Sequence, residues 1–274
     1  MLEKEIRIPS HGRDLDCYLA IPGDAGRRQP AVVVIHEIFG PDAHIRDVAK
    51  RFSAQGYLAA APNLFTGELQ RFLTPSAIGL AMQAFAGAPP DLRRNPEKMA
   101  EFVASQPPER RPVLEAFARI QSPVVQAGFA QDLGAVTRHL RTIAEVDADR
   151  IGCVGFCFGG AMSARLATVD PELRAAVIFY GQNPPLVDVP RIHAKVLGLY
   201  GGEDVGITAA VPDFAAAMRA AGKSFEHHVY PGAKHAFFND TRPTNYHAES
   251  AKDAWTRVLR FFNDELGPTA PGPA

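Results

Sequence analysis

The chain has 274 residues, of which 46% are hydrophobic and 22% are charged, which excludes a wholly disordered or fibrous protein. Lys and Arg number 29 against 30 Asp and Glu, and this balance argues against a nucleic-acid binder that relies on a basic surface. Three cysteines cannot build a disulfide framework, and an odd number fits a reducing compartment. Charges from Glu3 onward and the lack of long apolar runs argue against a secretion signal or a membrane span. We therefore expect a cytoplasmic protein without membrane or nucleic-acid partners.

Strand-like and helix-like segments alternate along the chain, which predicts an α/β fold with a mostly parallel central sheet flanked by helices. Residues 3–8 and 14–21 are expected to form a strand pair that turns at Gly12. The run Ala31–His36 (AVVVIH) is apolar on both faces, as in the middle strand of a parallel sheet. The further expected strands are 57–61, 151–155, 175–180, 196–200 and 225–230, and the expected helices are 45–55, 126–144, 158–169, 207–221 and 246–266. Residues 1–266 are thus expected to form a single domain.

Residues 66–125 interrupt this alternation. They hold eight prolines, with short helix-prone pieces such as Glu97–Ser105 between them. A structureless loop of this length is improbable inside a compact domain, so we expect a helical insertion that acts as a cap or lid. The alternative is a structural excursion that touches no ligand. The last residues, 267–274 (GPTAPGPA), are expected to be a disordered tail.

The strongest chemical signal is the segment Gly155–Gly160 (GFCFGG), which follows the strand 151–155 and opens a helix. It matches the nucleophile elbow G-x-nucleophile-x-G, with Cys157 in place of the usual serine. The glycines let strand and helix approach closely, and a helix N-terminus favours a thiolate. Cys17 and Cys153 lack an activating base nearby and are expected to be small buried side chains.

A thiol nucleophile needs a base, and the base needs a group that orients it. Asp204 and His235 each follow an expected strand, in the loops GGED and PGAKHAF. Ligand sites of open α/β sheets gather at the carboxyl ends of strands, and the chain order of nucleophile, acid and histidine is that of α/β-hydrolases. We therefore predict a catalytic triad of Cys157, His235 and Asp204.

The loop His36–Gly40 (HEIFG) ends the strand 31–36 and is the expected second half of an oxyanion hole. The backbone N–H groups of Ile38 and Phe158 are the predicted donors. Glu37 would place a carboxylate beside the thiol, unless it is only a solvated loop acid. No ligand set with zinc spacing, no G-x-G-x-x-G pattern and no phosphate loop appears, so neither a metal nor a cofactor is expected.

These segments, together with Gly56–Leu64 (GYLAAAPNL), resemble the dienelactone hydrolase family over about residues 5–265, apart from the insertion. The resemblance implies a carboxylic ester or lactone hydrolase that converts a dienelactone to maleylacetate in chloroaromatic degradation. It implies that Glu37 pairs with the resting thiol of Cys157 and accepts its proton when substrate binds. The implied reaction runs through an acyl-enzyme on Cys157.

The family binds the carboxylate of dienelactone with arginines, one of them shortly after the catalytic histidine. Here the first arginine after His235 is Arg242, and the stretch after Leu64 offers several others, of which Arg71 is our candidate. Phe39 and Phe237 are the remaining candidates for substrate contact.

Three other functions stay open. The same triad is compatible with another small ester or thioester as the substrate. A protein of another class, one that binds a small molecule on this fold without turnover, would need a degraded triad. A thiol-redox protein fits poorly, because Cys153 and Cys157 do not form a C-x-x-C pair. The oligomeric state is not indicated by the sequence.

Overall fold

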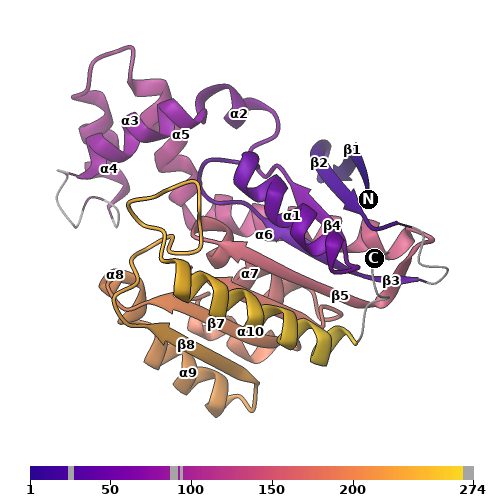
Figure 1. The fold of residues 1–274 in the computed structure, drawn as a ribbon. Coiled ribbons are helices and arrows are strands. Elements are labelled where there is room, and N and C mark those ends of the chain that lie inside the picture. The colour runs from indigo at the N-terminus through magenta and orange to yellow at the C-terminus, as the bar shows by residue number, and fades with distance from the viewer. Residues whose placement is uncertain (24–27, 87–91, 93–94, 268–274) are drawn as a thin grey trace.

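The computed structural model describes residues 1–23, 28–86, 92 and 95–267. Eight strands form one sheet in the order β1-β2-β4-β3-β5-β6-β7-β8 (Figure 1). The strands are β1 (Leu2–Ser10), β2 (Arg13–Ile21), β3 (Gln29–Ile35), β4 (Leu58–Pro62), β5 (Val146–Phe156), β6 (Ala175–Phe179), β7 (Lys195–Gly201) and β8 (Phe225–Tyr230). The pairs β1–β2 and β2–β4 are antiparallel and the other pairs are parallel. The predicted mostly parallel sheet is confirmed.

Helices cover both faces of this sheet (Figure 1). Helices α1 (Ala43–Ala54) and α10 (Ala248–Leu266) lie on one face, and α6 (Pro123–Thr142), α7 (Phe158–Val169) and α9 (Val211–Ala220) lie on the other. Along β3, Val32 and Val34 pack against the face that α1 and α10 cover, and Ala31 and Val33 pack against the face that α6, α7 and α9 cover. All four side chains are fully buried. Successive side chains of a strand point to opposite faces, so a strand covered on both faces is apolar throughout.

The described part of the insertion at residues 66–125 is helical, and residues 87–91 and 93–94 of that prediction lie outside the described residues. It contains α2 (Glu68–Phe72), α3 (Pro75–Ala86), α4 (Pro96–Ala104) and α5 (Arg111–Gln121). The ring of Phe85 packs against those of Phe102 and Phe117, with centroids 5.2 and 5.4 Å apart, and these rings continue the core on the α6 and α7 face of the sheet. Figure 1 shows α3, α4 and α5 grouped beside the main body, with α5 leading into α6.

Two element boundaries differ from the prediction for local reasons. The helix expected at 207–221 is split into α8 (Val205–Thr208) and α9, because Pro212 occupies the first turn of α9, where its missing N–H is tolerated. The strand expected at 175–180 ends at Phe179, because Tyr180 has a φ of 39°, in the left-handed region. A short 3-10 helix, η2 (Leu186–Arg191), follows.

The predicted tail and the predicted lack of a membrane span can each be compared with the described residues. The predicted tail of residues 267–274 lies outside the described residues beyond Gly267, which follows α10. Among the helices of the described ranges, none has both the length and the apolar composition that a membrane crossing requires.

Candidate active site

Cys157 stands at the sharp turn between β5 and α7. Its backbone has φ 55° and ψ −113°, a conformation that costs a non-glycine residue energy and that clusters at functional sites. The turn is held by the Cys157 N–H, which donates to the carbonyl of Phe179 at 3.0 Å. The Cys157 side chain is half-buried, whereas Cys17 and Cys153 are buried. Burial raises the pKa of the Cys153 thiol to about 12 and that of Cys17 further, so these two remain thiols at neutral pH.

Close packing around the turn accounts for the glycines of this motif. A Cβ atom on Gly155 would stand 1.9 Å from the carbonyl oxygen of Gly159, and one on Gly159 would stand 2.2 Å from the carbonyl oxygen of Ile35. Neither position accepts a side chain. The first turn of α7 is thereby pressed against the end of β3, where the loop with Glu37 begins.

Two loops bring the acid and the base together. Asp204 follows β7 and His235 follows β8, and His235 Nδ1 lies 2.5 Å from Asp204 Oδ2. Burial lowers the pKa of His235, but the carboxylate of Asp204 and the thiol of Cys157 outweigh this and raise the pKa to about 10. With Nδ1 engaged by Asp204, Nε2 is the nitrogen available to the thiol. The three predicted triad residues are thus brought together.

Glu37 is 2% exposed and sits in the loop after β3. Its Oε2 accepts a hydrogen bond from Asn239 Nδ2 at 2.8 Å and lies 3.8 Å from Nε of Arg242. Its Oε1 has no well-formed hydrogen bond within the described chain. Burial raises the pKa of the Glu37 carboxyl above its usual 4.5, against the opposing influence of His44, Asn239 and Arg242.

Tyr180 links Glu37 to the nucleophile. Burial raises the pKa of the Tyr180 phenol well above 10, and the charges of Glu37 and Cys157 and a hydrogen-bonding contact with the Glu37 carboxylate, too poorly aligned to count as well formed, add to the shift. Both groups therefore lie close to the same buried phenol. Glu37 is not a solvated loop acid, because almost none of it is exposed.

The predicted oxyanion donors flank the turn. Phe158 is the first residue of α7, so its N–H has no acceptor inside the helix. Ile38 is 8% exposed and directly follows Glu37. No hydrogen bond of the Ile38 N–H is found among the described residues.

The three residues predicted to contact substrate lie in different surroundings. Phe39 is half-buried, and the guanidinium of Arg242 lies 3.9 Å from the centre of its ring. Phe237 is fully buried among aromatic side chains of the core that include Tyr180 and Tyr230, so it supports the site from behind instead of touching a substrate. Arg71 is exposed on α2 and lines a surface hollow beside the β1–β2 hairpin instead of the triad.

Sequence reasoning assigned no role to Asn239 and named Arg242 only as the first arginine after His235. Both follow His235 within one loop, and for Asn239 this proximity in the chain is the only sequence signal. The carboxylate of Glu37 comes from a loop about two hundred positions earlier, so the contact depends on the tertiary fold. No group of three or more His, Cys, Asp or Glu side chains suited to a metal ion occurs in the described ranges.

A mostly parallel sheet with helices on both faces and a strained strand-to-helix turn at its centre defines an α/β-hydrolase. The model of the dienelactone hydrolase family matches residues 15–266, and the chain belongs to this family. The protein is accordingly a hydrolase that acts on carboxylic esters or lactones.

Relatives agree with this assignment. A protein of Saccharolobus solfataricus provisionally named carboxymethylenebutenolidase is 34% identical over 95% of this chain and 98% of its own. One of the same provisional name from Escherichia coli K12 is 35% identical over 95% of this chain and 86% of its own. The crystal structure of a provisionally named dienelactone hydrolase from Klebsiella pneumoniae has a TM-score of 0.71 and 33% identity, covering 95% of this chain and 98% of that one.

Proposed function

We propose that the protein hydrolyses a small ester or lactone through a thiolate nucleophile on Cys157, with dienelactone to maleylacetate as the leading reaction. The observation that carries this proposal is the contact set of His235, whose pKa is raised to about 10 by Asp204 on one side and by Cys157 on the other. A histidine held between a carboxylate and a half-buried thiol is the arrangement of a base and its nucleophile.

The proposed steps follow from these positions. The Cys157 sulfur forms a bond to the lactone carbonyl carbon, and the carbonyl electron pair moves onto oxygen, which the N–H groups of Ile38 and Phe158 stabilise. Collapse of this adduct breaks the ring C–O bond and leaves a thioester, and the released enolate oxygen takes a proton from His235, whose raised pKa keeps it protonated at neutral pH. The neutral imidazole then takes a proton from water as the water oxygen bonds to the thioester carbon. The C–S bond breaks, a carboxylic acid leaves, and the sulfur recovers its proton from Glu37.

Glu37 is proposed to take the thiol proton. A buried carboxylate with a raised pKa is a stronger base than an exposed one, and its Oε1 is not committed to a hydrogen bond of good geometry. Arg242 is proposed to bind the carboxylate of dienelactone, since it lies beside both Glu37 and Phe39 and its side chain is 36% exposed. Substrate would then draw Arg242 away from Glu37 and leave Glu37 a better proton acceptor.

The insertion is proposed to act as a cap that shapes the substrate pocket. A cavity of about 760 Å³ lies between the insertion and the β1–β2 hairpin, lined by Leu73 and Thr74 between α2 and α3 and by Phe39 of the oxyanion loop, while none of the triad residues lines it. Phe39 is the lining residue nearest in the chain to the oxyanion hole, so the cavity is proposed to receive the far end of a bulky substrate. Thr74→Trp should then raise KM for bulky esters more than for acetate. Leu80→Trp, at a 53% exposed position of α3, is the matched control and should change neither value.

A hydrolase of another small ester or thioester is the main alternative, because Arg71, the candidate from the stretch after Leu64, faces the hairpin and not the triad. A protein that binds such a ligand without turnover is the alternative of another class. Tight binding without turnover would favour it.

Turnover of trans- and cis-dienelactone should be compared with that of p-nitrophenyl acetate, with Cys157→Ala as the blank. We expect turnover of both substrate types to be lost in Cys157→Ala. Arg242→Ala should raise KM for dienelactone and spare the neutral ester, whereas Arg71→Ala should do neither. Activity retained in Cys157→Ala would refute the nucleophile, and turnover of the simple ester alone would refute the substrate.

A further inference from the structure

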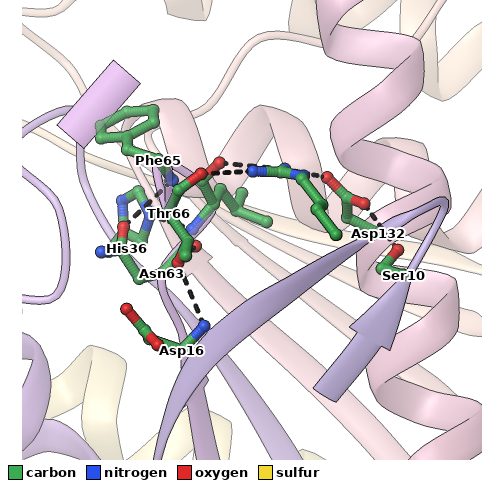
Figure 2. A network of polar contacts seen from close by, with 9 residues as sticks. Ser10, Asp16, His36, Asn63, Phe65, Thr66 and Asp132 are labelled. Carbon is green, nitrogen blue, oxygen red and sulfur yellow. Dashed lines mark hydrogen bonds and ion pairs between the residues drawn. The ribbon is translucent and has the colours of Figure 1, made fainter. Parts of the chain in front are cut away.

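His36 is fully buried directly after β3, and both of its ring nitrogens are engaged. Figure 2 shows His36 beside Asn63, Phe65 and Thr66 of the segment that follows β4. Nε2 accepts a hydrogen bond from the Leu64 N–H at 3.1 Å, and Nδ1 lies 2.5 Å from the carbonyl oxygen of Glu37. Because a backbone N–H only donates, Nε2 carries no hydrogen, and Nδ1–H must donate to the carbonyl. Burial lowers the pKa of His36 to about 4, so this neutral tautomer persists at neutral pH.

The carbonyl that His36 holds belongs to the same peptide unit as the N–H of Ile38. In a trans peptide the C=O and the N–H point in opposite directions, so fixing one fixes the other. The Glu37 carbonyl also accepts from the Gly40 N–H at 3.2 Å, which closes the turn of residues 37–40. Two donors therefore draw the carbonyl into the protein and direct the Ile38 N–H outward.

We propose that His36 is a positioning residue that sets the direction of the Ile38 N–H in the oxyanion hole. Its ring also packs against Phe158, with ring centroids 6.0 Å apart, and so contacts the residue that supplies the second donor. The role rests on the proposed thiol mechanism. It concerns only steps in which a carbonyl oxygen gains charge.

The other side of His36 is anchored at the start of the insertion. Arg13 donates to the carbonyl oxygens of Leu64 and Thr66, and its guanidinium also lies 2.5 Å from the buried carboxylate of Asp132. Asp132 in turn accepts from Ser10 Oγ at 2.6 Å. Figure 2 shows this chain of contacts running from the hairpin to His36. Leu64 is thereby a fixed donor, and it holds the imidazole in the orientation that serves Glu37.

Two substitutions separate the hydrogen bond that His36 donates to the Glu37 carbonyl from the one that it accepts from the Leu64 N–H. In His36→Asn the amide nitrogen stands near the position of Nδ1 and can donate to the Glu37 carbonyl, whereas in His36→Gln the amide oxygen stands near Nε2 and can accept from Leu64. Removal of an oxyanion donor lowers kcat by about 100- to 1000-fold, and a misdirected donor should cost roughly 30-fold or more. We expect His36→Gln to lose kcat on p-nitrophenyl acetate by that factor with KM little changed. His36→Asn should stay within about 5-fold of the parent protein.

Alkylation by iodoacetamide distinguishes a positioning role of His36 from a purely structural one. It consumes the Cys157 thiolate without forming an oxyanion, so its rate should be unchanged in His36→Gln. Equal losses of kcat in the two variants, or no loss in either, would overturn the proposal. A parallel fall of alkylation and ester turnover in His36→Gln would also overturn it, because it would indicate general disruption.

The tautomer can be measured in the unaltered protein, which keeps the proposal testable if a variant does not fold. Nitrogen NMR between pH 5 and 8, with the ring assigned through its hydrogen bond to the Leu64 N–H, should show a neutral imidazole protonated at Nδ1. A proton on Nε2 would refute the proposal. The Cys157→Ala assay reports on the nucleophile separately, so failure of the proposed function would be recognised by its own result.

Discussion

Glu37→Gln should make the protein more stable at neutral pH while impairing its chemistry. The Glu37 carboxylate is 2% exposed, and one of its two oxygens lacks a well-formed hydrogen bond. A buried charged group in this condition costs about 1–3 kcal/mol. The glutamine gives up the 3.8 Å contact with Arg242, whose side chain is partly exposed, at a cost of roughly 0.5–1 kcal/mol. The net gain is then about 1 kcal/mol, or roughly 2–4 °C in Tm for a domain of this size.

The gain should depend on pH with a defined sign. Folding raises the pKa of Glu37 above its usual 4.5, so the folded state holds a proton that the unfolded state has released. Glu37 therefore favours folding below pH 4.5, and this contribution is lost as pH rises through the folded pKa. Glutamine does not titrate. The stability advantage of Glu37→Gln should be largest near pH 8 and should shrink as pH falls toward 5.

Urea unfolding of both proteins at a series of pH values measures this difference. Asp132→Asn is the matched control, since Asp132 is also buried but has both carboxylate oxygens paired, with Ser10 and Arg13. It should lose stability at pH 8, because removing one partner of a buried pair is destabilising. A less stable Glu37→Gln at pH 8, or a difference that does not change with pH, would refute the argument.

Three further changes test the geometry of the site. Gly159→Ala should destabilise the protein by about 3 kcal/mol and abolish turnover, because its Cβ would meet the carbonyl of Ile35. An unchanged free energy of unfolding in urea would contradict the close packing. Gly128→Ala, on an open part of α6, should instead add about 0.5–1 kcal/mol, and a loss there would show that the position is not open. Asp204→Asn should lower kcat by roughly 100- to 10,000-fold and lower the pKa of His235 from about 10 in an NMR titration, and an unchanged pKa would remove Asp204 as its partner. Because a raised histidine pKa stabilises the folded state below pH 6.5 and less as pH nears 10, this variant should lose more stability at pH 6 than at pH 10.

The central sheet was predictable because its signals are local. A run such as Ala31–His36 can only be buried on both faces, and the glycines around Cys157 report a turn that strand and helix must share. The break between α8 and α9 was missed because the apolar spacing continues across it. Pro212 marks the new helix start, and a proline is compatible with a first turn as well as with an interruption.

The surroundings of the site were less predictable because they depend on which way loops fold. Phe237 and Phe238 both follow His235 closely, yet both are buried in the core, while Arg242 reaches back to Phe39. Arg71 looked equally suitable in sequence, but the short helix α2 leaves it on the hairpin side. Distance along the chain does not determine the side on which a residue lies once the loop has several turns.

Backbone strain in the described chain gathers in the loops that form the site. Four non-glycine residues of the described chain have positive φ, and Cys157, Tyr180 and Ala236 all belong to the loops that form the site. Glu37 Oε1 and the Tyr180 hydroxyl, both buried without well-formed hydrogen bonds, lie there too. Each of these features costs stability, and elsewhere the strands and helices follow ordinary propensities. The proposed role of Glu37 as proton acceptor beside the thiol would account for a buried carboxylate at this place, and the Glu37→Gln measurement tests whether that carboxylate lowers the stability of the fold.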